Sequence, residues 1–377
     1  MTETMKILLL CWRDSTHPQG GGSERYLEHV GEYLAARGHE VVYRTAGHTE
    51  APVKTERGGV RYVRAGGKFT VYPRALASIL LGRLGIGSLR GVDVVVDTQN
   101  GVPFFAALVA GRPTVLLTHH CHREQWPVAG RLLGRFGWFL ESRVAPRIYR
   151  GRPYLTVSQA SKSELAELGV DADDVRIIAN GVDPVPGSLP QLTDDGALHL
   201  VTLSRLVPHK RLEHAIDAVA DLVDEHPNVV LDVISSGWWE DNLRSYAIQR
   251  GVAERVIFHG QVTEDYKHAL LARAAVHLMP SRKEGWGLAV MEAARHAVPT
   301  VGYRVSGGLR DSIRHEETGL LVETLPGFIA AVRELLDDPA HRSRLGAEAL
   351  AWSGQFSWDD TGAQFEELLT GLTAQDS

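Results

Sequence analysis

The chain has 377 residues, of which 23% are charged, and a formal net charge of −6 at pH 7. Its length exceeds the usual span of about 100 to 200 residues for one domain, so we expect two domains of similar size. The negative balance excludes a general attraction to nucleic acid or anionic lipid, so any basic function must be local. Two cysteines, Cys11 and Cys121, are too few for a disulfide framework and favour a reduced, cytoplasmic setting.

The first half of the chain alternates between predicted strands and helices. Residues 6–12 (KILLLCW) predict a strand, a glycine-rich loop follows, and apolar residues recur at helical spacing from Tyr26 to Leu34. Gly38 is a stop signal before the next strand, so the pattern indicates a β-α-β unit of parallel-sheet type. Further strands are predicted at residues 39–45, 60–65, 92–98 and 113–120.

A second series of the same kind follows a linker rich in Pro, Gly and Asp, residues 179–197, with a hinge near residues 184–197. Helices are predicted after Lys210, over 266–275 and from Gly287, and strands at residues 197–206, 229–235, 254–260 and 276–281. We therefore predict an α/β fold with two Rossmann-like domains. Their ligands should bind beyond the carboxyl ends of the strands, in a cleft between the domains.

Residues 281–300 (SRKEGWGLAVMEAARHAVPT) place two acids around a glycine-punctuated helix start. Gly285 and Gly287 leave its backbone amides open to a polar ligand. Glu284 and Glu292 should lie roughly 8 to 12 Å apart, a span that suits two hydroxyl-bearing parts of one elongated ligand. The alternative is that Glu284 is an acid favoured by the helix dipole and Glu292 a solvated surface residue.

Two other loops carry groups that suit phosphates. Arg205 and Lys210 flank a proline-containing turn after a strand and could reach a diphosphate; solvated basic residues are the alternative. The glycines of residues 19–25 (QGGGSER) could present amides to a phosphate, with Ser23 capping the helix. This is a weak dinucleotide fingerprint, because its third glycine would fall on Arg25, and a structural turn is the alternative.

Three histidines follow a predicted strand in residues 118–126 (THHCHREQW). No carboxylate or cysteine set with suitable spacing completes a zinc site around His119, His120 and His122, so we expect no metal there. A single histidine that hydrogen-bonds a substrate hydroxyl is the favoured interpretation. A structural histidine with satisfied hydrogen bonds is the alternative for the others.

Taken in order, these segments resemble a retaining glycosyltransferase of the GT-B fold, from glycosyltransferase family four. The resemblance runs from residues 6–25 to residues 356–369 (FSWDDTGAQFEELL), and its most specific part is E-x7-E, from Glu284 to Glu292 with EGWGL inside. It implies two Rossmann-like domains facing across a cleft and a C-terminal helix that returns toward the first. The ranges we assign are an acceptor-side domain, a donor domain and the returning helix, at residues 1–187, 188–355 and 356–377.

The resemblance also implies a role for each motif. Glu292 would bind the donor's ribose, Arg205 and Lys210 its diphosphate, and Glu284 the transferred sugar, together with the backbone of Gly285, Trp286, Gly287 and Leu288. Gly21 and Gly22 would close on the phosphates. His119, or alternatively His120, would steady charge beside the reacting carbon. The leaving phosphate would take the acceptor's proton, with no metal and no cofactor. Ser204 and the segment 235–241 (SSGWWED) depart from the family pattern, which leaves the particular sugar open.

The partners we expect are a UDP- or GDP-sugar and an acceptor that is a sugar, a glycolipid or a small-molecule glycoside, but no nucleic acid. Residues 131–152 hold six arginines and Glu141. Arg131, Arg135 and Trp138 share a helical face, which predicts peripheral contact with the inner face of a membrane or a phosphorylated acceptor. A solvated face over a packed aromatic core is the alternative. The alternative functions are a GT-B-like nucleotide-sugar epimerase or hydrolase, and a non-catalytic nucleotide-sugar binding protein.

Overall fold

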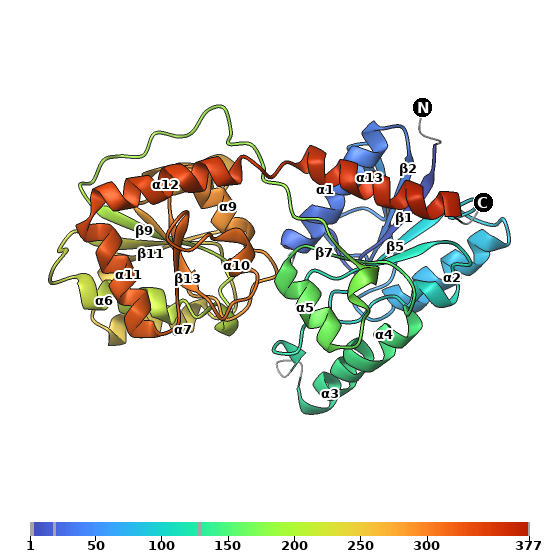
Figure 1. Ribbon diagram of the computed structural model, residues 1–377, viewed down its shortest axis with the longest axis horizontal. Helices are drawn as coiled ribbons and strands as arrows, with labels where there is room; N and C mark the ends of the chain where they lie inside the picture. The colour runs from blue at the N-terminus through green and yellow to red at the C-terminus, as the bar shows by residue number, and fades with distance from the viewer. Residues whose placement is uncertain (1–3, 18–19, 127–129, 376–377) are drawn as a thin grey trace. The chain divides into compact units, whose positions relative to one another are not determined.

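The protein folds into two compact units in the computed structural model, which describes residues 4–17, 20–126 and 130–375 (Figure 1). Unit 1 consists of Met1–Gly181 and Ser357–Ser377, and unit 2 of Val182–Phe356. The chain therefore enters unit 2 once and returns to unit 1 for its last helix. The first boundary predicted from the sequence lies after residue 187, inside the linker, which is a few residues later than the boundary between Gly181 and Val182 in the structure.

Unit 1 is built on an eight-stranded sheet with the order β3-β4-β2-β1-β5-β6-β7-β8. Neighbouring strands are parallel except for the β3–β4 hairpin. Every residue of β5 is buried, as expected for a parallel strand covered on both faces. The strands are β1 (Lys6–Leu10), β2 (Glu40–Thr45), β3 (Lys54–Arg57), β4 (Val60–Arg64), β5 (Val94–Thr98), β6 (Thr114–Leu117), β7 (Tyr154–Thr156) and β8 (Val175–Ile177). All five strands predicted in this half are confirmed; β3, β7 and β8 lie outside the predicted set.

The last helix of the chain completes unit 1, as the resemblance implied. Helix α13 packs against α1 so closely that a Cβ on Gly362 would meet the Tyr33 ring at 2.2 Å. The Thr361 hydroxyl also donates to the carbonyl of Ala179 (2.9 Å). The helices of this unit are α1 (Gly22–Ala36), α2 (Val71–Arg83), α3 (Arg131–Phe139), α4 (Ala145–Ile148), α5 (Gln159–Glu167) and α13 (Trp358–Gln375), with a π-helical turn at Leu140–Val144.

Unit 2 has a six-stranded, all-parallel sheet with the order β11-β10-β9-β12-β13-β14. Its strands are β9 (Leu198–Leu203), β10 (Val229–Ile234), β11 (Val256–Gly260), β12 (Val276–Met279), β13 (Thr300–Tyr303) and β14 (Gly319–Val322). Its helices are α6 (Glu213–Leu222), α7 (Glu240–Gln249), α8 (Glu264–Arg273), α9 (Leu288–Ala294), α10 (Leu309–Ser312), α11 (Leu325–Asp337) and α12 (Pro339–Ser353). The four strands predicted for this half are confirmed.

Both sheets reverse their strand order at one place, between β1 and β5 in unit 1 and between β9 and β12 in unit 2. Loops that leave neighbouring strands in opposite directions separate there, which opens a crevice at the carboxyl ends of the strands. The predicted site residues follow β1, β6, β9 and β12. Among the described residues, no helix is long and apolar enough to span a membrane.

Candidate functional site

The candidate site of unit 2 lies where two loops meet at the strand reversal. Residues 204–212 follow β9, and residues 280–287 follow its neighbour β12. The backbone N–H of Arg282 donates to the carbonyl of His209 (2.9 Å), which ties one loop to the other. Together the loops carry five Lys or Arg side chains against the single carboxylate of Glu284, an excess of positive charge that favours an anionic ligand.

A close ion pair joins the two loops at their centre. The ammonium of Lys210 lies 2.5 Å from Oε1 of Glu284, and the two side chains are only 13% and 12% exposed. Arg205 is exposed on the same loop as Lys210. Burial, with the neighbouring Lys210 charge, lowers the pKa of His209 to about 4, so this ring is neutral at pH 7. The structure thus brings two of the predicted residues, Lys210 and Glu284, into contact, and places Arg205 on the same loop as Lys210.

Glycines shape the loop that carries Glu284. Gly287 has a φ of 100°, a left-handed conformation that other residues adopt at a cost, and α9 begins at the next residue. Gly308 lies against this loop: its N–H donates to the carbonyl of Glu284 (3.2 Å), and a Cβ there would stand 2.5 Å from the carbonyl carbon of Gly285. The backbone of residues 284–287 is therefore fixed by direct contact with the segment that leads into α10.

Glu292 is positioned by a buried lysine that the sequence did not single out. Lys267, on α8, is 8% exposed in its side chain and binds Oε1 of Glu292 at 2.6 Å and the carboxylate of Glu264. Burial disfavours the lysine charge, but the two acids outweigh it and raise the pKa of Lys267. With its side chain 17% exposed, Glu292 is not the freely solvated residue of the alternative interpretation.

The other predicted residues of this loop differ in exposure. Trp286 is buried, and its ring packs edge-on against Phe356 with the centroids 5.1 Å apart. Leu288 is partly buried at the first position of α9. The indole of Trp286 therefore belongs to the packing of unit 2, and a contact with a ligand would come from its backbone.

In unit 1, His119 follows the end of β6 and is 6% exposed. Burial lowers its pKa to about 4 despite the nearby Glu24 charge, and its ring meets the Tyr26 ring edge-on at 5.2 Å. Its Nε2 is buried and has no hydrogen-bond partner within the described part of the chain. A buried nitrogen without a partner is costly, so this atom fits the predicted hydrogen bond to a substrate hydroxyl. His120 instead lies against Gln125 (3.0 Å).

The glycine loop of unit 1 differs from the prediction in its capping. Gly21 is the N-cap of α1, and its N–H donates to the Oε2 of Glu24 at 2.8 Å. The predicted cap by Ser23 is wrong, because Ser23 lies inside the first turn and its hydroxyl also donates to Glu24 (3.0 Å). Glu24 is fully buried and paired with Arg13 at 2.6 Å. The amide of Gly21, predicted to bind a phosphate, is thus held by a carboxylate of its own helix.

A second residue beyond the predicted set, Glu141, fixes the segment after His119. Its fully buried carboxylate accepts hydrogen bonds from the backbone N–H of His122 (2.8 Å), the indole of Trp126 (2.5 Å) and the amide of Gln99 (3.3 Å). It lies in the π-helical turn, a feature often found at functional sites. Nothing in the sequence indicates this role, because all three partners lie on other segments.

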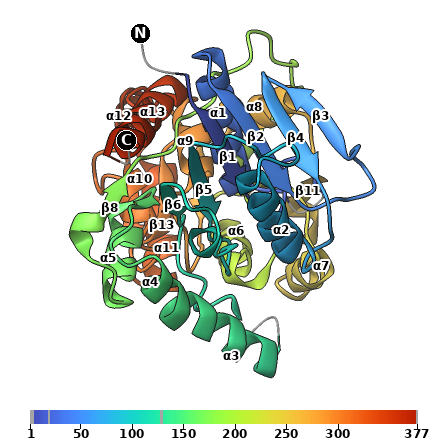
Figure 2. The same ribbon diagram turned by 90° about the vertical axis from the view of Figure 1, so that its right-hand side faces the viewer.

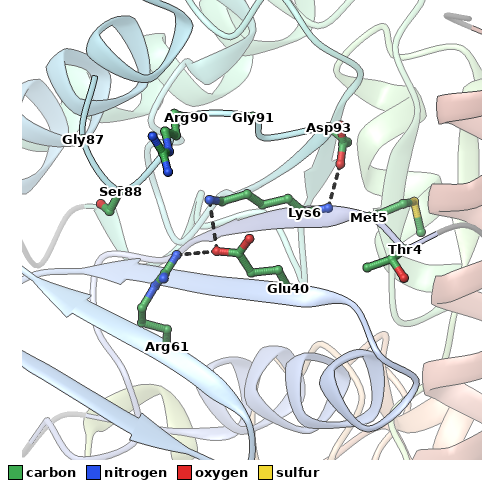
Figure 3. A pocket seen from close by; sticks show the side chains of 10 residues that line it. All are labelled: Thr4, Met5, Lys6, Glu40, Arg61, Gly87, Ser88, Arg90, Gly91 and Asp93. Atoms are coloured by element: carbon green, nitrogen blue, oxygen red, sulfur yellow. Dashed lines mark hydrogen bonds and ion pairs between the residues drawn. The ribbon is translucent and has the colours of Figure 1, made fainter. Parts of the chain in front are cut away.

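A separate pocket of about 810 Å³ lies at the amino ends of the unit 1 strands, away from the carboxyl ends that His119 follows (Figure 3). Lys6 and Glu40 begin β1 and β2, and both Lys6 (3.0 Å) and Arg61 (2.7 Å) pair with Glu40 inside it. The backbone N–H of Lys6 donates to Asp93 (2.7 Å). Ligands of parallel sheets bind at the carboxyl ends of strands, so this pocket at their amino ends is not the candidate site.

Comparisons with known proteins identify the family of the chain. A family model described as Glycosyl transferases group 1 matches residues 190–352, and one described as Glycosyltransferase Family 4 matches residues 20–185. The GDP-mannose-dependent alpha-(1-6)-phosphatidylinositol monomannoside mannosyltransferase of Mycobacterium tuberculosis (strain H37Rv) is 31% identical over 283 residues, which cover 70% of this chain and 71% of that protein.

Solved structures match the fold of nearly the whole chain. Sucrose-phosphate synthase from Thermosynechococcus elongatus has a TM-score of 0.82 at 21% identity, over 98% of this chain and 100% of that one. Anabaena HepE in complex with UDP and glucose has a TM-score of 0.76 at 18% identity, with the same coverage of 98% and 100%. The chain therefore belongs to glycosyltransferase family four and is a nucleotide-sugar glycosyltransferase with the GT-B fold.

Proposed function

We propose that this protein transfers a hexose from a UDP- or GDP-sugar to an acceptor hydroxyl, with retention of configuration and without a metal ion. The observation that carries the proposal is the Lys210–Glu284 pair, which joins two cationic loops at the strand reversal of unit 2. Both nucleotides have support: the mycobacterial relative is GDP-mannose-dependent, and the HepE structure holds UDP and glucose. The named relatives do not favour an epimerase, a hydrolase or a non-catalytic binder.

Each group of unit 2 has a distinct task in this proposal. Glu292, held by Lys267, accepts hydrogen bonds from the ribose hydroxyls. Lys210 and Arg205 bind the diphosphate, and Glu284 binds the transferred sugar together with the backbone of Gly285 to Leu288. Since Lys210 contacts Glu284, the cation for the leaving group and the acid for the sugar are adjacent, as they must be at the two ends of one scissile bond.

Retention needs no protein nucleophile in this scheme. The leaving phosphate, stabilised by the two cations, takes the acceptor's proton on the face from which it departs, so the acceptor bonds to that same face. His119 is neutral at pH 7, because burial lowers its pKa to about 4. It therefore acts through a hydrogen bond to the sugar and not as an acid. The acceptor class stays a sugar, a glycolipid or a small-molecule glycoside.

The first test is a thermal-shift screen, beginning with GDP-mannose and UDP-glucose. A donor that binds only the folded protein adds about 2.7 kcal/mol of stability at 100 times its Kd, so the correct nucleotide class should raise the melting temperature clearly. Each donor is compared with its free nucleotide and with ATP. Product analysis by NMR then follows the anomeric configuration. No shift with either class, or donor consumption at the same rate without an acceptor, would contradict the proposal.

Metal independence gives a second prediction. The cations of Arg205 and Lys210 neutralise the leaving diphosphate in place of a divalent ion, so initial rates in excess EDTA should equal those in untreated buffer. The measurement is sugar transfer by protein that has been dialysed against EDTA, with and without added magnesium or manganese. Loss of activity in EDTA and its recovery with either ion would show that the two cations are insufficient.

A further inference from the structure

Helix α3 of unit 1 carries an exposed apolar surface. Leu132, Leu133, Phe136 and Phe139 are 84%, 47%, 58% and 53% exposed, and we call these four residues the α3 stripe. Three of them recur at i, i+4 and i+7, so they lie along one face of the helix. Figure 2 shows α3 extending away from the sheet of its unit. Soluble proteins seldom expose aromatic and aliphatic side chains in such a row without a partner.

The opposite face of α3 consists mainly of small residues that let the helix lie close to its unit. Gly134 and Gly137 are buried, and a Cβ on Gly137 would stand 2.2 Å from the Trp126 ring. The helix therefore contributes few large apolar side chains to the core and directs most of them outward. Helix α2 differs, because it buries Val71, Ala75 and Ile79 in a core cluster although some of its leucines are exposed.

The ionisable side chains exposed beside the α3 stripe are all basic over residues 131–152. Arg131, Arg135, Arg143 and Arg147 are exposed, whereas Glu141, the one acid of this segment, is fully buried and bonded to unit 1. The fold thus removes the only negative charge of the segment from this surface. In a chain with a net charge of −6, the result is a local positive surface around an apolar row.

We propose that the α3 stripe and its arginines dock on an anionic lipid bilayer. The apolar side chains would enter the boundary between headgroups and acyl chains, while the arginines contact lipid phosphates. A second copy of this chain fits the surface less well, because pairing two α3 helices would oppose like charges. The proposal does not depend on the nucleotide donor or on retention.

The predicted membrane face changes in one respect. Trp138 is only partly exposed, and the Arg123 guanidinium lies over its ring at 5.9 Å, so it is not the outward anchor. Leu132, Phe136 and Phe139 take that place, with Arg131 and Arg135 beside them. Of the three residues that the sequence predicts on this face, Arg131 and Arg135 are exposed, and Trp138 is only partly exposed.

The test is co-sedimentation of the full chain with phosphatidylcholine vesicles, with and without phosphatidylglycerol. We expect binding to the anionic vesicles at low salt, weaker binding as salt rises, and little binding to phosphatidylcholine alone. Arg131→Glu/Arg135→Glu should weaken binding at least tenfold, since each arginine near the surface contributes roughly fivefold. Leu132→Ser/Phe136→Ser should also weaken it at least tenfold, because it removes apolar side chains that enter the bilayer. The matched control is Leu81→Ser/Leu84→Ser, two exposed leucines at the end of α2, which should bind like the wild type.

Two further measurements make the result decisive. The melting temperature without donor should be the same in all variants, which shows that they fold and keeps this test separate from the donor proposal. Light scattering follows self-association. No binding to anionic vesicles at low salt, equal loss in the α2 control, or a dimer that the α3 substitutions abolish would each overturn the proposal.

Discussion

Replacing Glu284 by glutamine is expected to lower kcat by about 10²- to 10³-fold while changing the donor Kd little. Glu284 lies next to Lys210, where the bond to the leaving phosphate breaks in the proposed reaction, so its contact with the sugar should strengthen as charge develops. Glutamine keeps the shape of the side chain and removes its charge. Steady-state kinetics give kcat, and titration of the donor into the protein gives Kd.

Glu292→Ala should show the opposite pattern, a weaker donor Kd with a smaller change in kcat, because the ribose does not change during transfer. The matched control is Glu264→Gln, since Glu264 shares Lys267 with Glu292 but has no proposed contact with the donor. The assignment of both acids would fail if Glu284→Gln and Glu292→Ala had equal and negligible effects on kcat and Kd.

Asp232→Asn should destabilise unit 2 by about 3 to 5 kcal/mol, because it leaves the guanidinium of Arg273 without its buried counter-charge and removes a carboxylate that contacts two histidine rings. Asp232 is fully buried on β10 and contacts the rings of His199 (2.8 Å) and His259 (2.7 Å) and the guanidinium of Arg273 (3.0 Å). Urea unfolding measures the loss. Asp241→Asn, at an exposed acid of α7, is the control and should stay within about 0.5 kcal/mol of the wild type.

The same cluster gives this stability a pH dependence. Burial favours the neutral acid, but hydrogen bonds from His199 and His259 outweigh it and hold the pKa of Asp232 below its ordinary value. Its contribution is therefore present above about pH 3.9, the unfolded value, and is lost as the pH falls further. Burial opposes the charge of His199, but Asp232 and Asp195 outweigh it and raise its pKa. That contribution is present below about pH 6.5 and is lost as the pH rises through the folded pKa.

Unfolding measured from acid to alkaline pH should show both losses in the wild type and a flatter profile in Asp232→Asn. Identical pH profiles for the two proteins would show that the cluster adds nothing to the pH dependence of this stability.

Local pattern was sufficient for the strands that form the centre of each sheet. The apolar run of residues 92–98 predicted a strand, and every residue of β5 is buried, as in a parallel strand covered on both faces. The hairpin strand β3 has the sequence KTER, with three exposed residues, and β7 and β8 have three residues each. Strands of this kind depend on pairing with a neighbour, which is not visible in a short window of sequence.

The site shows the same division between local and distant information. The spacing of Glu284 and Glu292 within one loop and helix was readable, as was the turn with Arg205 and Lys210. The contacts that hold these acids were not, because Lys210 and Lys267 lie 74 and 25 residues away from their partners. The prediction of the α1 cap failed for a different reason. Ser23 and Glu24 are both common near helix starts, and the distant contact with Arg13 helps to place Glu24.

The return of the chain to unit 1 has a consequence for synthesis and for exchange of parts. The ribosome makes α13 after all of unit 2, so α1 gains the helix that packs on it only when the rest of the protein already exists. Unit 2 also begins and ends at neighbouring points, since the N–H of Val182 donates to the carbonyl of Phe356 (3.3 Å). In unit 1, on the other side of the two junctions, Gly181 packs tightly against Trp358. In genetic terms unit 2 is an insertion within the sequence of unit 1, and the junctions 181/182 and 356/357 are the two places at which it would be exchanged for that of another family member.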